Sequence, residues 1–233
     1  TQTIAKVDKI VGPGNKWVQA AKKNVAGDYV GIDSIAGPSE VLILANDQAN
    51  PAWVAADMLS QAEHGTDSSA VVVTDSQPLA RAILEQLREQ LNALPRAAEA
   101  AQSLSRFSRI IMLKDMDTAI NLANEFACEH LEVQCGSQSR QIADRITNAG
   151  AIFIGPHTPV AVGDYWAGPS HTLPTGTRAK FSSALTCNDF VKSISLIEYS
   201  AEQLAASADD IIRLAEVEGL DAHARSVKIR KQP

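Results

Sequence analysis

Cysteines, aromatic side chains and long apolar runs are all scarce in this sequence of 233 residues. The only cysteines are Cys128, Cys135 and Cys187, and their spacing gives neither a disulfide framework nor a CxxC metal knuckle. That usage is typical of a reducing compartment, so we predict a cytoplasmic location. No apolar run has the length of a membrane span and no charged-then-apolar leader is present, so we expect no membrane association.

An excess of positive charge is also lacking, since the formal net charge is -6. Without a basic stripe to neutralise phosphates, a nucleic-acid partner is not expected. The GxGxxG fingerprint of dinucleotide-binding turns is missing as well. The turn Gly12-Pro13-Gly14-Asn15 precedes a predicted helix and would present backbone amides to a phosphate, but alone it is a weak indication of a dinucleotide.

The sequence does contain a regular alternation of apolar strands and amphipathic helices. Strands are predicted at residues 41–44, 70–73, 110–113 and 151–154, with a shorter strand at 131–133. Helices are predicted at 51–64, from about 79 to Pro95, and at about 117–126. This order predicts an α/β fold with a mostly parallel sheet flanked by helices, in which ligands are expected at the carboxyl ends of the strands.

Two regions fall outside that alternation. The first forty residues contain the glycine-rich turn, a short helix and the loop 36–39. From about Asn188 the chain becomes helical, and residues 201–218 have an apolar stripe without a strand partner. We expect this tail to pack on the main domain or on a second subunit. The predicted parts are therefore residues 1–40, an α/β main domain at 41–187, and a helical tail at 188–233.

One pair of residues suggests a metal site. Gln61 and His64 lie at the end of the helix predicted at 51–64, where residues three apart share a face. A hard oxygen donor beside an imidazole nitrogen suits a zinc-like cation better than soft thiolate chemistry does. Two ligands are too few to hold a metal ion, so others are required.

Two further groups of residues are candidates for chemistry. Glu129 and His130 are adjacent at a predicted helix-to-strand junction and would form paired acid–base groups, although a solvated loop explains the same spacing. Asp164 and His171 lie in a long polar loop after the strand at 151–154. Asp164 would supply a carboxylate ligand there, or form an ordinary Asx turn.

The remaining histidines give weaker signals. His223 follows Glu218 by five residues in the helical tail, and a single helix histidine is more often a surface or core residue than a ligand. His157 has no partner in the sequence, so we assign it no role.

Six segments, taken together and in this order, resemble histidinol dehydrogenase. They are residues 7–15 (VDKIVGPGN), 36–41 (AGPSEV), 60–65 (SQAEHG), 129–131 (EHL), 163–165 (GDY) and 168–175 (GPSHTLPT). The resemblance covers essentially the whole chain but only about the C-terminal half of the family's usual length. Because the first residue is Thr1 and not methionine, we expect a fragment with an incomplete Rossmann-like fold.

The resemblance implies an activity and a site. The activity is the oxidation of L-histidinol to L-histidine through an aldehyde, with two hydride transfers to NAD and one bound zinc ion. The implied zinc ligands are Gln61, His64, Asp164 and His223. His130 is implied to be the base for the alcohol proton, and Glu129 the group that activates water for the second oxidation. Implied substrate contacts are the four metal ligands, His130, Ser39, His171 and Glu218, and Asn15 is implied to contact the cofactor.

The resemblance also implies a homodimer. In the family the helical tail crosses to the neighbouring subunit, so His223 and Glu218 are expected to complete the active site of the partner.

The chain departs from the family pattern in three places. The missing N-terminal half supplies much of the cofactor cleft, Val160 stands where the family usually has Glu, and His157 replaces a usual aromatic residue. Two other functions stay open: a relative that oxidises another small polyol, such as a sulfonated diol, and a catalytically silent zinc-binding or dimerisation domain. A metallohydrolase fits less well because the sequence has no HExxH helix.

Overall fold

The structure is a computed structural model that describes residues 3–231. It divides into two units, Thr1–Val191 and Lys192–Pro233, each of which is described by itself. The division of the first unit into residues 1–40 and 41–187 stays a prediction. All three cysteines are free thiols, as their spacing predicts, and no helix of residues 3–231 is long and apolar enough to cross a membrane.

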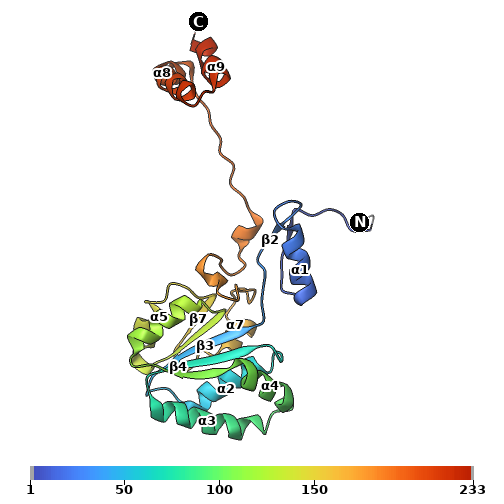
Figure 1. Ribbon diagram of the computed structural model, residues 1–233, viewed down its shortest axis with the longest axis vertical. Coiled ribbons are helices and arrows are strands. Elements are labelled where there is room, and N and C mark those ends of the chain that lie inside the picture. Colours follow the sequence, from blue (N-terminus) through green and yellow to red (C-terminus); the bar gives the residue numbers. More distant parts are fainter. Residues whose placement is uncertain (1–2, 232–233) are drawn as a thin grey trace. The chain divides into compact units, whose positions relative to one another are not determined.

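A five-stranded parallel sheet forms the centre of the first unit (Figure 1). Its strands, in spatial order, are β5 (Arg109–Met112), β4 (Ser69–Thr74), β3 (Glu40–Ala45), β6 (His130–Gln134) and β7 (Ala151–Ile154). The chain order reverses between β3 and β6, as in doubly wound α/β folds. The predicted strands are confirmed, and their ends differ from the prediction by one residue at most.

Helices cover both faces of this sheet. One face packs against α2 (Pro51–Ala62), α3 (Gln77–Leu91) and α4 (Ala97–Phe107), and the other against α5 (Met116–Phe126) and α6 (Ser139–Ala143). Side chains alternate accordingly along β3: Val41 and Ile43 belong to the first core, and Leu42 and Leu44 to the second. Helices α4 and α6 were not predicted.

Helix α2 brings its C-terminal end back to the amino ends of the strands. The Asn50 side chain accepts hydrogen bonds from the backbone N–H groups of Ala52 and Trp53, and Pro51 occupies the first helical position. Since α2 connects the end of β3 to the start of the parallel strand β4, it must run opposite to both. The short helix α7 (Val160–Tyr165) follows β7.

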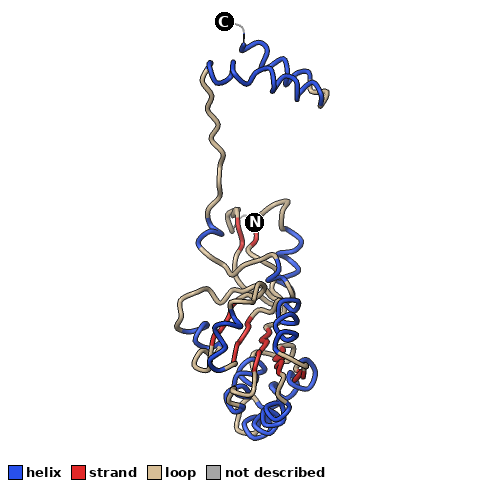
Figure 2. Tube along the Cα trace, turned by 90° about the vertical axis from the view of Figure 1, so that its left-hand side faces the viewer, coloured by secondary structure: helices blue, strands red, loops and turns tan. Residues whose placement is uncertain are grey.

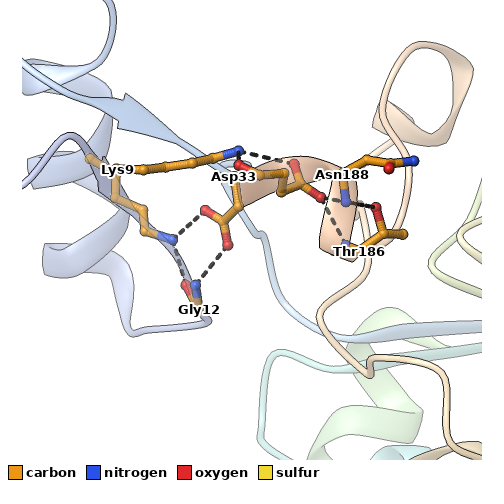
Figure 3. Close-up of polar contacts among 7 residues, drawn as sticks. Lys9, Gly12, Asp33, Thr186 and Asn188 are labelled. Carbon is orange, nitrogen blue, oxygen red and sulfur yellow. Dashed lines mark hydrogen bonds and ion pairs between the residues drawn. The ribbon is translucent and has the colours of Figure 1, made fainter. Parts of the chain in front are cut away.

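The N-terminal part of this unit is held by a buried ion pair. It consists of a two-stranded pair, β1 (Lys9–Ile10) and β2 (Gly31–Ile32), and the helix α1 (Lys16–Val25). The Lys22 Nζ atom lies 2.7 Å from Asp33 Oδ1, with side chains only 3% and 4% exposed. Asp33 Oδ2 accepts a hydrogen bond of 2.7 Å from the Gly12 N–H, as Figure 3 shows. This pair therefore fixes the glycine-rich turn.

A second ion pair joins β1 to the 3₁₀ helix η3 (Cys187–Phe190). Lys9 Nζ lies 3.1 Å from Asp189 Oδ1, and Asp189 Oδ2 accepts a hydrogen bond of 2.8 Å from the Thr186 N–H (Figure 3). This ion pair thus ties the N-terminal part of the unit to a segment near its C-terminal end.

The second unit is a helical hairpin. Helices α8 (Ala201–Val217) and α9 (Asp221–Lys231) are joined by a turn in which Gly219 has a φ of 72°. Residues 191–200 precede them without regular structure (Figure 2). The helical region was expected from about residue 188, but regular helix starts at Ala201.

We predict that Lys22→Met unfolds the N-terminal part. Burial would by itself raise the pKa of Asp33, but hydrogen bonds from Lys22 and the Gly12 and Ser34 backbone hold it below its ordinary value. Removing Lys22 leaves a buried carboxylate without its cation, which costs on the order of 3 kcal/mol. Amide hydrogen exchange across residues 9–33 should rise. The exposed neighbour provides the control, since Lys23→Met should leave exchange unchanged.

Candidate functional site

The chain enters β6 through a left-handed residue. Helix α5 ends at Phe126, and the buried Ala127 has a φ of 48°, which turns the backbone toward Glu129. Glu129 and His130 lie at the start of β6 and are only 7% and 6% exposed. The predicted helix-to-strand junction is confirmed, and the solvated-loop interpretation of these two residues is wrong because both are buried.

Glu129 and Glu40 exchange hydrogen bonds across the starts of two neighbouring strands. Glu129 Oε2 accepts from the Glu40 N–H at 3.0 Å, and the Glu129 N–H donates to Glu40 Oε1 at 3.2 Å. Glu40 Oε1 also accepts from the Gly176 N–H at 3.0 Å. The three bonds hold both carboxyl groups in place, so backbone amides set their orientation.

The imidazole of His130 is oriented by the backbone of β3. Its Nδ1 atom lies 3.1 Å from the Glu40 carbonyl oxygen and 3.5 Å from Glu129 Oε2. A proton on Nδ1 donates to that carbonyl, which leaves the lone pair of Nε2 free to accept a proton. The ring also contacts Phe153, with ring centroids 5.9 Å apart.

Electrostatics keep His130 neutral. Burial lowers the pKa of His130, and the nearby His64 lowers it further, whereas the Glu40 backbone contact and the Asp164 carboxylate partly oppose this. A neutral imidazole is the form that accepts a proton.

The pKa of Glu129 is raised, whereas that of His130 is lowered. Burial raises the pKa of Glu129 to about 8, and the charges of Glu40 and Asp164 add to the increase, while a hydrogen bond from the Glu40 backbone opposes it. At neutral pH this carboxyl group therefore retains its proton in much of the population. Adjacent groups thus have different acid–base properties, which suits a site with two proton-transfer tasks.

A cavity of about 170 Å³ adjoins His130. Asp164 and His171 line it together with the apolar side chains of Ile152, Phe153 and Leu173. Asp164 lies in helix α7 and not in a loop, which corrects our prediction. The loop prediction failed because Gly163 is a poor helix former. In this helix a Cβ at residue 163 would lie 2.7 Å from the Phe153 ring, so only glycine lets α7 pack so closely.

Gln61 has the features of a ligand that lacks its partner. Gln61 is 2% exposed. Its Nε2 atom is buried and makes no hydrogen bond to any of the described residues. A buried polar atom without a partner is costly. Since the amide oxygen and nitrogen exchange places by a half-turn of the group, Gln61 is able to offer an oxygen at that point.

His64 lies just after the end of α2 and is exposed, and within residues 3–231 its Nε2 makes no hydrogen bond. Its Nδ1 lies 2.9 Å from the Ser60 carbonyl oxygen, so a proton on Nδ1 leaves Nε2 as the ligating atom. Both His64 and Asp164 act on the charge state of His130, which places all three in one electrostatic neighbourhood. In residues 3–231 no three His, Cys, Asp or Glu side chains come close enough to hold a metal. A zinc ion therefore fits here only with the carboxamide of Gln61 and a further ligand.

The other predicted residues are more dispersed. Ser39 is half-buried immediately before β3, where its carbonyl oxygen accepts a hydrogen bond of 3.1 Å from the Ser69 N–H. Asn15 caps α1, its Oδ1 accepting from the Trp17 and Val18 N–H groups. Glu218 and His223 are exposed and lie on either side of the turn between α8 and α9 in the second unit.

The two departures, Val160 at the start of α7 and His157 in the loop before it, are not among the residues that line the cavity. Val160 is 5% exposed and packs in the core with Phe153, and the His157 ring stacks at a tilt on Trp53, with centroids 5.5 Å apart.

The candidate residues gather at the amino edge of the sheet, not at the carboxyl edge where we expected ligands. Glu40, Glu129 and His130 lie where β3 and β6 begin, and Gln61 and His64 lie where α2 ends. The connections at the carboxyl ends of β3, β4 and β5 contain none of these residues. Helix ends and strand starts share an edge in a parallel sheet, and this topology explains why these residues meet there. That ligands bind at the carboxyl ends of the strands stays a prediction.

Sequence reasoning missed the part played by Glu40. It belongs to the segment 36–41, but we gave it no role. The available signal was a charged residue at the first position of a buried apolar strand, which needs a specific polar partner.

Comparison with known proteins identifies the family. The family model for histidinol dehydrogenase matches residues 1–231. The chain belongs to the histidinol dehydrogenase family. It is 49% identical over 230 residues to the histidinol dehydrogenase of Nitrobacter winogradskyi and 50% identical over 224 residues to that of Heliobacterium mobile. These matches cover 99% and 96% of this chain but 53% and 52% of the relatives.

Solved structures support the same family and fold. The crystal structure of histidinol dehydrogenase from Elizabethkingia anophelis matches with a TM-score of 0.92 and 40% identity, over 99% of this chain and 53% of that one. An acetylating aldehyde dehydrogenase from Geobacillus thermoglucosidasius, at 14% identity and a TM-score of 0.54 over 83% of this chain and 58% of its own, shares the fold alone. The predicted family and α/β fold are thus confirmed, and the chain spans about half the length of the histidinol dehydrogenases that it matches.

We predict a pH-dependent stability that Glu129→Gln reduces. In the native protein the raised pKa, about 8, keeps a proton that the unfolded chain loses near its ordinary value of 4.5. Because the native state binds more protons between these values, the free energy of unfolding should fall as pH rises through this range. Chemical denaturation at several pH values measures this slope without added metal. An equally steep slope in the glutamine variant would contradict the assignment to Glu129.

Proposed function

We propose that this chain carries the catalytic and metal-binding part of an enzyme that oxidises L-histidinol to L-histidine through histidinal, the last step of histidine biosynthesis. Two successive hydride transfers would go to NAD. The observation that carries the proposal is the buried Glu129–His130 pair beside the cavity that Asp164 and His171 line. Membership of the histidinol dehydrogenase family supports the substrate.

In the first oxidation His130 takes the proton of the alcohol. Its Nδ1 faces the Glu40 carbonyl oxygen, so Nε2 is the accepting atom. As the hydroxyl proton moves to Nε2, the hydride leaves the neighbouring carbon and an aldehyde forms. The lowered pKa of His130 keeps the imidazole neutral and ready for this transfer.

In the second oxidation Glu129 takes a proton from water. The water adds to the aldehyde carbon, and the resulting hydrate loses its hydride to give the acid. The raised pKa of Glu129 makes its carboxylate a stronger base than an ordinary glutamate, at the expense of the fraction ionised at neutral pH. One buried residue therefore serves each oxidation.

The proposed zinc ligands are Gln61, His64, Asp164 and His223. The unpaired amide of Gln61 and the free Nε2 of His64 support a cation near α2. A bound zinc ion would anchor the substrate and polarise its hydroxyl group. Ser39, His171 and Glu218 are proposed to contact the substrate, and Asn15 to contact NAD.

We also propose a homodimer in which the tail of one subunit, with Glu218 and His223, completes the site of the other. Large apolar side chains of the tail and of the loop before it are exposed, including Leu196 (94%), Ile197 (85%) and Val217 (82%). Exposed apolar residues gathered in one segment are typical of a surface that a partner covers.

We predict that His64→Asn and Asp164→Asn weaken zinc binding. Loss of a ligand should raise the dissociation constant by at least the 10- to 100-fold typical of disturbed metal sites, because each variant removes a charge or a nitrogen donor. Isothermal titration with zinc measures it. His157→Asn is the matched control, since this exposed histidine stacks on Trp53 and has no proposed ligand role. Unchanged zinc affinity in both ligand variants would refute the assignment.

We predict that Glu129→Gln slows the second oxidation more than the first. The variant keeps an oxygen for the Glu40 N–H but loses the base for water, at a cost on the order of 100-fold or more. NADH formation is measured separately from histidinol and from histidinal, with Glu125→Gln, an exposed position on α5, as the control. An equal loss in both half-reactions would contradict the division of roles. Wild-type zinc uptake without NADH formation would contradict the proposed activity.

A further inference from the structure

The interior of the sheet contains a carboxylic acid that the proposed chemistry does not use. Glu132 lies in the middle of β6 and is completely buried, at 0% exposure. It follows His130 by two residues, so both side chains lie on the same face of the sheet, the face that α2 covers. A glutamate is almost never fully buried unless it has specific partners.

Glu132 has partners on three elements. Its Oε1 accepts a hydrogen bond of 3.1 Å from the Val160 N–H at the start of α7, and its Oε2 accepts one of 3.4 Å from Gln134 Nε2. A further hydrogen bond joins it to the carboxyl group of Asp57 on α2. A bond between two carboxyl groups requires a proton on one of them. Burial raises the pKa of both carboxyl groups, and the charge of Asp57 raises that of Glu132 further, so the pair shares one proton.

Helix α7 depends on this contact for its start. Pro159 precedes the helix and provides no side-chain cap. The Glu132 carboxyl group takes that role from the sheet, since it satisfies the first free N–H of the helix. Asp164 lies within the same short helix, so the position of its carboxylate follows from where Val160 is held.

Helix α2 is joined to Glu132 through Asp57. Asp57 precedes Gln61 by four residues, which puts the two on one side of α2, and His64 follows just after the helix ends. Through Val160 and Asp57, Glu132 therefore links the helix that carries Asp164 with the helix that carries Gln61.

We propose that Glu132 is a positioning residue that sets the spacing between Asp164 on α7 and the Gln61–His64 pair at the end of α2. This inference rests on the proposed function, because those three residues are its proposed zinc ligands. Glu132 itself touches neither substrate nor metal. It acts through the Val160 N–H and through Asp57.

The test uses the full chain and two variants that break the link in different ways. Glu132→Leu removes the carboxyl group from β6. Val160→Pro leaves Glu132 intact and removes the N–H that it binds, and proline suits the first position of a helix, so this variant is expected to fold. Glu132→Gln is the conservative variant, because its amide still accepts from Val160 and donates to Asp57.

Two measurements separate positioning from general stability. Amide exchange of residues 161–165 is followed without metal, and the dissociation constant for zinc alone is measured by titration. We expect both link-breaking variants to speed this exchange and to weaken zinc binding on the order of tenfold or more, and Glu132→Gln to restore both. Val133→Ala is the matched control, because Val133 is equally buried in the same strand but faces the opposite core.

The outcomes are distinct. Unchanged zinc affinity in Val160→Pro and Glu132→Leu, or a Glu132→Gln variant as impaired as Glu132→Leu, would overturn the positioning role. A loss in Val133→Ala as large as that in Glu132→Leu would also overturn it. If the wild-type chain binds no zinc, the proposed metal site fails. Exchange of residues 161–165 then decides alone whether Glu132 holds α7.

Discussion

The reciprocal hydrogen bonds between Glu40 and Glu129 are the constraint on which the candidate site depends. They join the first residue of β3 to the residue just before β6, and the Glu40 carbonyl oxygen also orients the imidazole of His130. Burial raises the pKa of both glutamates, although backbone N–H groups partly oppose it for each. The sheet thus holds two acidic groups side by side and supplies the backbone N–H dipoles that keep them aligned.

Much of this fold is predictable from local pattern. The buried strands are runs of apolar residues too short for helices, and α2 has a capping asparagine and a proline at its start. The short helix α7 was missed because its sequence contains Gly163, and because its first N–H is capped by Glu132, a residue distant in sequence. Helix α4 was missed because we took Pro95 as the end of the helical region, while the chain resumes a helix at Ala97.

The site itself was less predictable from spacing alone. Gln61 and His64 share a helix end, so their pairing follows from periodicity. Glu40 and Glu129 are separated by 89 positions, and only the parallel pairing of β3 with β6 brings them together. The edge at which the residues gather also depends on topology, which no local motif reports. The resemblance to the family supplied His223 and Glu218, which lie in the separate helical hairpin, and its assignment of those residues stays a prediction.

The candidate residues lie at the amino edge of the sheet, so the connections at the carboxyl ends of β3, β4 and β5 contain none of them. The connections that leave the carboxyl ends of β3, β4 and β5 lie a full strand length from Glu129 and His130. Such surface loops tolerate inserted residues when their backbone groups are not tied to the interior. Insertions in those connections are therefore expected to leave the Glu129–His130 pair where the sheet holds it.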